Sequence, residues 1–230
     1  MIQLTLLRKL VMALTGLFLC VFLVIHLLGN LQLFLPKEHA QEQFNAYSQL
    51  LSGNPLIKVV SIVLYLSILA HAIYAVVITI YNRKSGGNYT HDSRSKVSPW
   101  YSRSMGVLGT VLFVFIVVHF QNFWYYYKFT AMPLDAWGRK DLYSAVVNLF
   151  ANGWYVVLYV VSMIAMGYHL LHGVYSAVRT LGLYHPKYVN AVKFAGVAYT
   201  VIIAGGFTII PIYVFFVQHQ EKVLSFLQVK

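Results

Sequence analysis

The chain has 230 residues, of which 59% are hydrophobic and only 10% charged, and its mean hydropathy is +0.67. A soluble domain usually carries about 25% charged residues, so this composition excludes a soluble globular protein and indicates one surrounded by lipid for much of its length. The formal net charge of +11 does not indicate a nucleic-acid partner, because the basic residues lie in short segments between apolar runs, where membrane proteins concentrate them.

Five apolar runs follow one another along the chain, at roughly 8–35, 56–82, 101–128, 152–180 and 191–217. Each exceeds the roughly 20 residues that a helix needs to cross a bilayer. None shows the alternating pattern of a membrane β-barrel strand, so we expect helices, whose backbone groups bond internally. The sequence therefore predicts an all-α fold, a single membrane domain over residues 1–230 with five transmembrane helices.

Loop charges predict the orientation of these helices. One side holds ten cations and one acid, namely Arg8, Lys9, Arg83, Lys84, Arg94, Lys96, Arg103, Arg179, Lys187 and Lys193 with Asp92. The other holds seven cations and five acids, namely Lys37, Lys58, Lys128, Arg139, Lys140, Lys222 and Lys230 with Glu38, Glu42, Asp135, Asp141 and Glu221. The positive-inside rule places the first side, with the N-terminus, in the cytoplasm and the C-terminus outside. We expect a multi-pass protein of a bacterial inner membrane.

Histidines are the unusual residues of the apolar runs. Four of the nine lie in loops or tails and are expected to be solvated: His39, His91, His185 and His219. Five lie within apolar runs: His26, His71, His119, His169 and His172. An ionisable residue inside a membrane is costly and indicates a functional site. One such histidine could equally be a hydrogen-bonded core residue, but four helices that each carry one favour function.

Depth divides these histidines into two pairs. His26 and His119 each lie about 18 residues from the cytoplasmic end of their helices, which is roughly 27 Å at 1.5 Å per residue. His71 and His169 each lie about 11 residues from that end, which is roughly 16 Å. The two levels are thus expected to be roughly 11 Å apart. His172 is a rival for His169, but it lies roughly 4.5 Å nearer the cytoplasm.

Paired histidines on facing helices are typical of haem ligation in a helical bundle. The only cysteine is Cys20, so the chain has no C-x-x-C-H motif for a covalently attached haem. The pattern predicts two b haems, an outer one held by His26 and His119 and an inner one held by His71 and His169. Two imidazoles close the iron to oxygen, which suits electron transfer.

Glycines accompany this pattern. Gly16 lies ten residues before His26, and Gly109 lies ten before His119, so both fall near the inner level. A missing side chain there would let a macrocycle approach the backbone, although small residues also help membrane helices pack. Gly173, four residues after His169, admits the same two interpretations.

The chain resembles the five-helix, di-haem cytochrome b membrane subunit (b558 type) of succinate dehydrogenases and fumarate reductases. The resemblance covers nearly the whole chain and rests on four short motifs: Thr15-Gly16-Leu17-Phe18 followed by His26 and Gly29-Asn30, Ala70-His71-Ala72, His119-Phe120, and Gly167-Tyr168-His169-Leu170-Leu171-His172-Gly173. In that family the ligand on the fourth helix stands four residues before a glycine, which selects His169.

The resemblance implies partners and a task. Such a subunit anchors a flavoprotein and an iron–sulfur subunit on the cytoplasmic face. It passes electrons between iron–sulfur clusters, the two haems and a membrane quinone, with menaquinone the expected one, as part of the respiratory chain and the tricarboxylic acid cycle. The dicarboxylate chemistry belongs to the flavoprotein, so no catalytic residue is expected here. Some fumarate reductases of this type carry a glutamate in a proton path where this chain has Gly167, so we expect no such path.

Two further sets of residues are expected near the cofactors. The loop after the first helix offers donors and a proton carrier for an outer quinone site, with Asn30 and Glu42 preferred over Gln32, Glu38, Asn45 and Tyr47. Arg8, Lys9 and Arg179 are candidates for haem propionates. Solvated loop residues and contacts with the iron–sulfur subunit are the respective alternatives.

Two other functions compete with this interpretation. A di-haem cytochrome b can anchor another respiratory dehydrogenase, such as a hydrogenase or formate dehydrogenase, although their histidines are usually placed differently. A haem-free transporter would usually show broken helices or inverted repeats around a midplane site, and the sequence shows neither.

Overall fold

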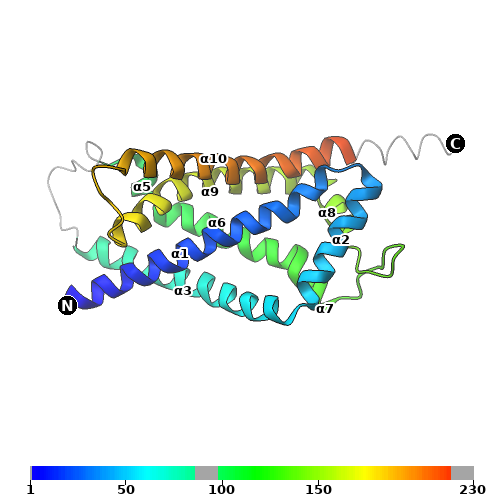
Figure 1. Ribbon diagram of the computed structural model, residues 1–230, viewed down its shortest axis with the longest axis horizontal. Coiled ribbons are helices and arrows are strands. Elements are labelled where there is room, and N and C mark those ends of the chain that lie inside the picture. The colour runs from blue at the N-terminus through cyan, green and yellow to red at the C-terminus, as the bar shows by residue number, and fades with distance from the viewer. Residues whose placement is uncertain (1, 86–97, 219–230) are drawn as a thin grey trace.

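The computed structural model describes residues 2–85 and 98–218 (Figure 1). Five helices in these ranges are long and apolar enough to cross a membrane, which confirms the prediction of an all-α chain with five spans. The spans are Leu6–Phe34, Pro55–Lys84, Met105–Phe129, Gly153–Thr180 and Val189–Val217. Several residues used in the sequence analysis lie outside the described residues: His91, Asp92, Arg94, Lys96, His219, Glu221, Lys222 and Lys230.

Three spans are single α-helices for most of their length: α1 (Ile2–Asn30), α3 (Pro55–Ser85) and α9 (Gly153–Thr180). A 3-10 turn, η1 (Leu31–Phe34), extends α1. The fifth span is α10 (Val189–Tyr213), which contains Pro211 and continues as the π-helical turn η3 (Val214–Gln218).

The third span is segmented. A short helix, α5 (Trp100–Arg103), precedes α6 (Met105–His119), and a π-helical segment, η2 (Phe120–Tyr125), joins α6 to α7 (Tyr126–Phe129). Wide π turns inside α-helices are rare and frequently occur at functional sites. Here the change of winding begins directly after His119.

Two helices lie in segments that the sequence analysis treats as loops, and those assignments are wrong. α2 (Lys37–Gly53) follows the first span, and α8 (Leu142–Phe150) precedes the fourth. α8, with nine residues, is too short to cross a bilayer, and α2 is too polar, so a search for long apolar runs misses both. α8 does carry a readable start signal, since the Asp141 carboxylate accepts a hydrogen bond of 3.1 Å from the backbone N–H of Ser144.

Four spans surround a common interior. α1 and α6 each contact both α3 and α9, and α10 packs along α9 and contacts α1 (Figure 1). Gly206 of α10 permits a close approach, because a Cβ atom there would lie 2.9 Å from the side chain of Leu27. The largest buried apolar cluster joins α9 and α10 to α2 and α8 at the end of the bundle that carries these short helices.

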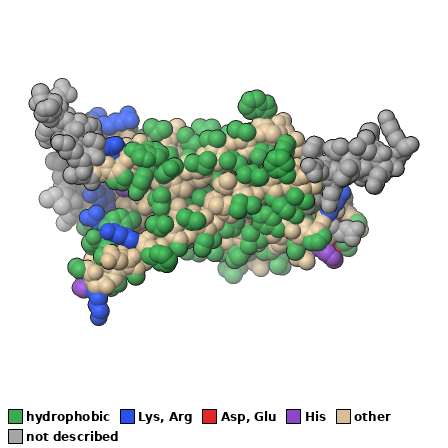
Figure 2. All heavy atoms as spheres, turned by 90° about the horizontal axis from the view of Figure 1, so that it is seen from above, with side chains coloured by type: hydrophobic (Ala, Val, Ile, Leu, Met, Phe, Trp, Pro, Cys, Tyr) green, Lys and Arg blue, Asp and Glu red, His purple; other side chains and the backbone are tan. Residues whose placement is uncertain are grey.

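The surface has the distribution expected in a bilayer. Hydrophobic side chains cover the length of the molecule, and Lys and Arg gather at its two ends (Figure 2). Within the described ranges, all four acidic residues lie at the end that carries α2, namely Glu38, Glu42, Asp135 and Asp141. The opposite end therefore has the more positive described surface.

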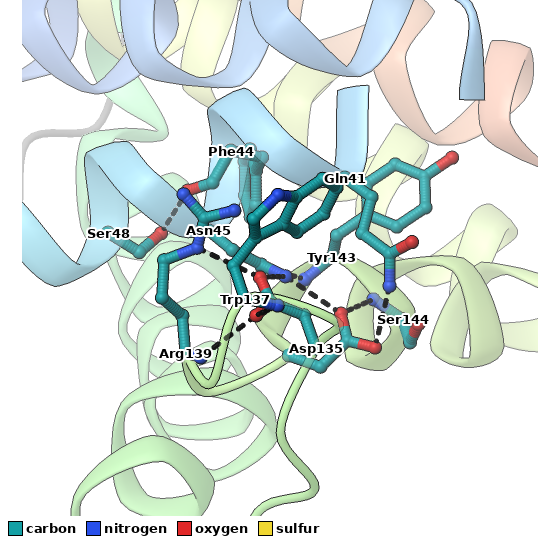
Figure 3. A network of polar contacts seen from close by, with 10 residues as sticks. Gln41, Phe44, Asn45, Ser48, Asp135, Trp137, Arg139, Tyr143 and Ser144 are labelled. Atoms are coloured by element: carbon teal, nitrogen blue, oxygen red, sulfur yellow. Dashed lines mark hydrogen bonds and ion pairs between the residues drawn. The ribbon is translucent and has the colours of Figure 1, made fainter. Parts of the chain in front are cut away.

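A polar network closes the end that carries α2 (Figure 3). The Asn45 amide of α2 donates to Asp135 (3.1 Å) and to Asp141 (3.0 Å), and its oxygen accepts from the backbone N–H of Tyr143 (2.9 Å). Gln41 also donates to Asp141. These bonds tie α2 to the loop before α8 and hold it across the end of the bundle.

Candidate metal centre

The structure brings the histidines of the apolar helices together in two pairs. His26 of α1 and His119 at the end of α6 have ring centroids 5.8 Å apart, with the ring planes at 85°. His71 of α3 and His169 of α9 have ring centroids 6.2 Å apart, with the planes at 60°. Each pair joins helices that are far apart in sequence.

The ring separations fit two imidazoles on opposite sides of one metal ion. An imidazole nitrogen binds a first-row metal at about 2 Å and lies about 1 Å from its ring centre, so opposed rings would have centroids about 6 Å apart. No group of three or more His, Cys, Asp or Glu side chains gathers in the described part of the chain. Two protein ligands alone suit an iron whose remaining positions are filled by a macrocycle, which favours haem over a zinc or di-iron site.

A large cavity contains both pairs. It measures about 2180 Å³ and is lined by residues of α1, α3, α6 and α9, including His26, His71, His119 and His169. Small-molecule pockets usually measure about 300–1,000 Å³. The cavity therefore has room for more than one large ligand.

Glycines face the second histidine pair. A Cβ atom added to Gly16 of α1 would lie 3.2 Å from Cε1 of His71. One added to Gly109 of α6 would lie 4.0 Å from Cε1 of His169. Gly173 also lines the cavity, and a Cβ atom there would meet nothing within 4 Å. The missing side chains thus leave space beside His71 and His169.

The positions of Gly16 and Gly109 give the distance between the two histidine pairs along the bundle. Gly16 contacts His71 and lies ten residues from His26, while Gly109 approaches His169 and lies ten residues from His119. At 1.5 Å per residue, both helices place the pairs about 15 Å apart along their axes. This exceeds the roughly 11 Å expected from depth, because that count depends on where each helix is taken to end.

His169, not His172, faces His71. His172 lines the same cavity one turn further along α9. The Nδ1 atom of His169 is buried and has no hydrogen-bond partner in the described part of the protein.

Thr15 holds His71 from the neighbouring helix. Its Oγ1 lies 3.2 Å from Nδ1 of His71 and 2.7 Å from the carbonyl oxygen of Val11. The carbonyl oxygen of Met12 also lies 3.2 Å from this hydroxyl. With the hydroxyl proton on the shortest of these contacts, the one to Val11, the Thr15 oxygen accepts the Nδ1–H of His71. This arrangement leaves Nε2 of His71 as the nitrogen able to bind a metal.

No family model, curated protein or solved structure matches the chain. Its function therefore has to be inferred from the cavity and from the residues that line it. The two histidine pairs are the most specific feature of that lining.

Two of the three predicted cationic residues line the cavity. Lys9 and Arg179 line it, whereas Arg8 is not among the lining residues. The guanidinium of Arg179 lies 5.8 Å from the ring of Tyr175 and 5.3 Å from that of Tyr184, both cation–π distances. Arg83 also lines the cavity, although the sequence analysis considered it only for topology.

The structure separates the two preferred quinone residues. Asn30 lines the cavity, with its Nδ2 donating to the carbonyl oxygen of His26 at 2.8 Å. Glu42 is exposed on α2 and is not among the residues that line the cavity. Of the other residues considered, Tyr47 lines the cavity. The Oε1 atom of Gln32 is buried and has no hydrogen-bond partner among the described residues. Asn45 belongs to the polar network of Figure 3.

Proposed function

We propose that the chain is the di-haem cytochrome b subunit that anchors a succinate dehydrogenase or fumarate reductase in a bacterial inner membrane. The observation that supports the proposal is the presence of two histidine pairs inside one cavity of about 2180 Å³. The ring centroids within the two pairs are 5.8 and 6.2 Å apart. A di-haem cytochrome needs this arrangement, and a haem-free transporter does not.

The residues then have definite tasks. His26 and His119 would hold the outer haem b, and His71 and His169 the inner one. Each haem supplies an iron that accepts and gives up one electron. Gly16 and Gly109 leave space beside the inner pair, and Lys9, Arg83 and Arg179 offer cations to haem carboxylates at the basic end of the cavity.

The route of the electrons across the membrane follows from the proposed topology. The basic end, with Arg8 and Lys9, would lie in the cytoplasm and carry the iron–sulfur and flavoprotein subunits. Electrons would cross between those clusters and a quinone, with menaquinone the expected one, near the outer histidine pair. Asn30 and Tyr47 lie in the cavity lining there and replace the pair Asn30 and Glu42 as candidates for quinone contact. The dicarboxylate would be transformed on the flavoprotein.

A reduced-minus-oxidised visible spectrum of the purified chain tests the proposal. Two low-spin b haems per chain are expected, and a chain without such a band would overturn it. Isolation of the native complex identifies the partner, since an anchor of a hydrogenase or formate dehydrogenase would purify with that enzyme in place of a flavoprotein subunit.

A further inference from the structure

Tyr159 lies beside His119. It belongs to α9, is only 6% exposed, and its Oη atom lies 3.4 Å from Nδ1 of His119. The rings of Phe115 and Phe150 meet its ring edge-on, each with a centroid distance of 4.9 Å. The phenol is thus fixed in one position by packing.

The Tyr159 oxygen lies within hydrogen-bond distance of Nδ1 of His119, so a proton on this nitrogen has an acceptor within reach. A histidine that binds a metal through Nε2 keeps its proton on Nδ1. The phenol oxygen is therefore placed to accept a hydrogen bond from His119.

We propose that Tyr159 and His119 form a relay to the metal, in which the phenol fixes the protonation and orientation of His119. In this relay His119 Nδ1–H donates to the Tyr159 oxygen. Nε2 of His119 would then carry the lone pair that binds the metal. Tyr159 is a positioning residue, because it acts on the iron only through His119, and the inference rests on the proposed haem function.

The relay predicts a direction of effect. A ligand histidine that donates its second N–H becomes more basic, and a more basic ligand favours ferric over ferrous iron. Second-shell hydrogen bonds of this kind are a recognised determinant of haem potential. Thr15 has the corresponding position beside His71, so each histidine pair has one hydrogen-bonded member from a different helix.

Tyr159→Phe tests the relay, since it removes the hydroxyl and keeps the ring. We expect the preference of the outer haem for ferric iron to fall about tenfold, which raises its midpoint potential by about 59 mV for one electron. The inner haem should not change. Thr15→Val should give the converse result, with a rise for the inner haem only. Both potentials are measured by redox titration of the complex, followed by visible and electron paramagnetic resonance spectra.

Tyr155→Phe is the matched control, because it removes a hydroxyl one turn earlier on α9 that the structure does not place on a histidine nitrogen. Unchanged potentials and g values in Tyr159→Phe would overturn the relay while leaving the haem proposal standing. Wild-type protein without b haem would instead overturn the proposed function. If Tyr159→Phe assembles without haem, Tyr159→Gln tests the same relay, because its amide oxygen can accept from His119 Nδ1–H. Loss of the outer haem in that variant as well would give Tyr159 a packing role only and would overturn the relay.

Discussion

His71 and His169 have ring centroids 6.2 Å apart although 98 positions separate them in the chain. They meet because α1 and α6 both lie between α3 and α9, and because Gly16 and Gly109 add no side chain beside them. Contacts between these helices would not by themselves indicate a bound ligand. Two facing histidine rings inside an apolar membrane bundle do indicate one, because ionisable side chains are costly there and usually have a function.

The histidine variants should lose haems one pair at a time. His26→Ala or His119→Ala is expected to leave one haem per chain, the inner one, and His71→Ala or His169→Ala to leave the outer one. The reason is that a haem held by packing loses an axial bond when either ligand is removed. Haem per chain is measured from the pyridine haemochrome spectrum.

His172→Ala is the matched control for these variants. It lines the same cavity one turn from His169 but does not face His71. Both haems should remain in this variant. If His169→Ala kept two haems while His172→Ala lost one, the ligand assignment on α9 would be wrong.

Gly16→Val should remove the inner haem selectively. Its nearest added atom would lie 3.2 Å from Cε1 of His71, and the further methyl groups of valine would extend into the space beside that ring. The expected outcome is one haem per chain, with the spectrum of the outer haem retained. Gly205→Val on α10 is the control, since a Cβ atom there meets nothing within 4 Å and Gly205 does not line the cavity. A Gly16→Val protein with two haems would show that the glycine serves helix packing alone.

Much of the fold is readable from the sequence because lipid imposes a simple rule. A run of about 20 apolar residues must form a helix that satisfies its own backbone, so the five spans were predictable. α2 and α8 were not found, because α2 is largely polar and α8 has only nine residues, so neither forms a long apolar run. No pattern in the sequence predicts the polar network around Asn45, which holds α2 in place.

The pairing of the histidines in the candidate site was also predictable, because the helices are regular. Along a regular helix, residue number converts to depth at 1.5 Å per residue, so histidines at equal depth could be paired without coordinates. Tyr159 and Thr15 could not be linked to His119 and His71 in this way. Depth indicates which residues share a level, but the rotation of each helix, set by tertiary packing, decides which side chains face one another.

The orientation of the chain can be tested with single cysteines. Leu134, before α8, and Leu183, between α9 and α10, are 64% and 54% exposed and lie at opposite ends of the bundle. Each is replaced by cysteine in a Cys20→Ser background. The positive-inside rule predicts that a membrane-impermeant maleimide added to spheroplasts labels Leu134→Cys and not Leu183→Cys. Both should be labelled after permeabilisation, and the reverse pattern in intact spheroplasts would invert the proposed topology.

The Asp135 network should make the stability of the protein depend on pH. The Asp135 side chain is fully buried by surface area and accepts hydrogen bonds from Asn45 Nδ2, from the backbone N–H groups of Trp137 and Arg139, and from Arg139 Nε. Burial alone would raise the pKa of this carboxyl, but the hydrogen bonds together lower it below its ordinary value. The stabilisation is therefore complete above the unfolded pKa, about 3.9, and is lost as the pH falls through the lower folded pKa.

Replacement of Asp135 should remove that stabilisation. Asp135→Ala leaves the Arg139 guanidinium without its acceptor and removes one of the two carboxylates to which the Asn45 amide donates. Loss of one member of a buried pair costs about 3–5 kcal/mol. The melting temperature in detergent, followed by the reaction of the half-buried Cys20 thiol with a maleimide dye, should fall clearly at pH 7. The gap in melting temperature between wild type and variant should narrow below about pH 4, where the Asp135 carboxyl of the unfolded chain takes up its proton before that of the folded protein does. Glu42→Gln is the control, since this acid on α2 is exposed and no side-chain hydrogen bond to it is found among the described residues. Its effect should stay within about 0.5 kcal/mol. Equal melting temperatures for wild type and Asp135→Ala would show that α2 is held at the end of the bundle by its apolar contacts alone.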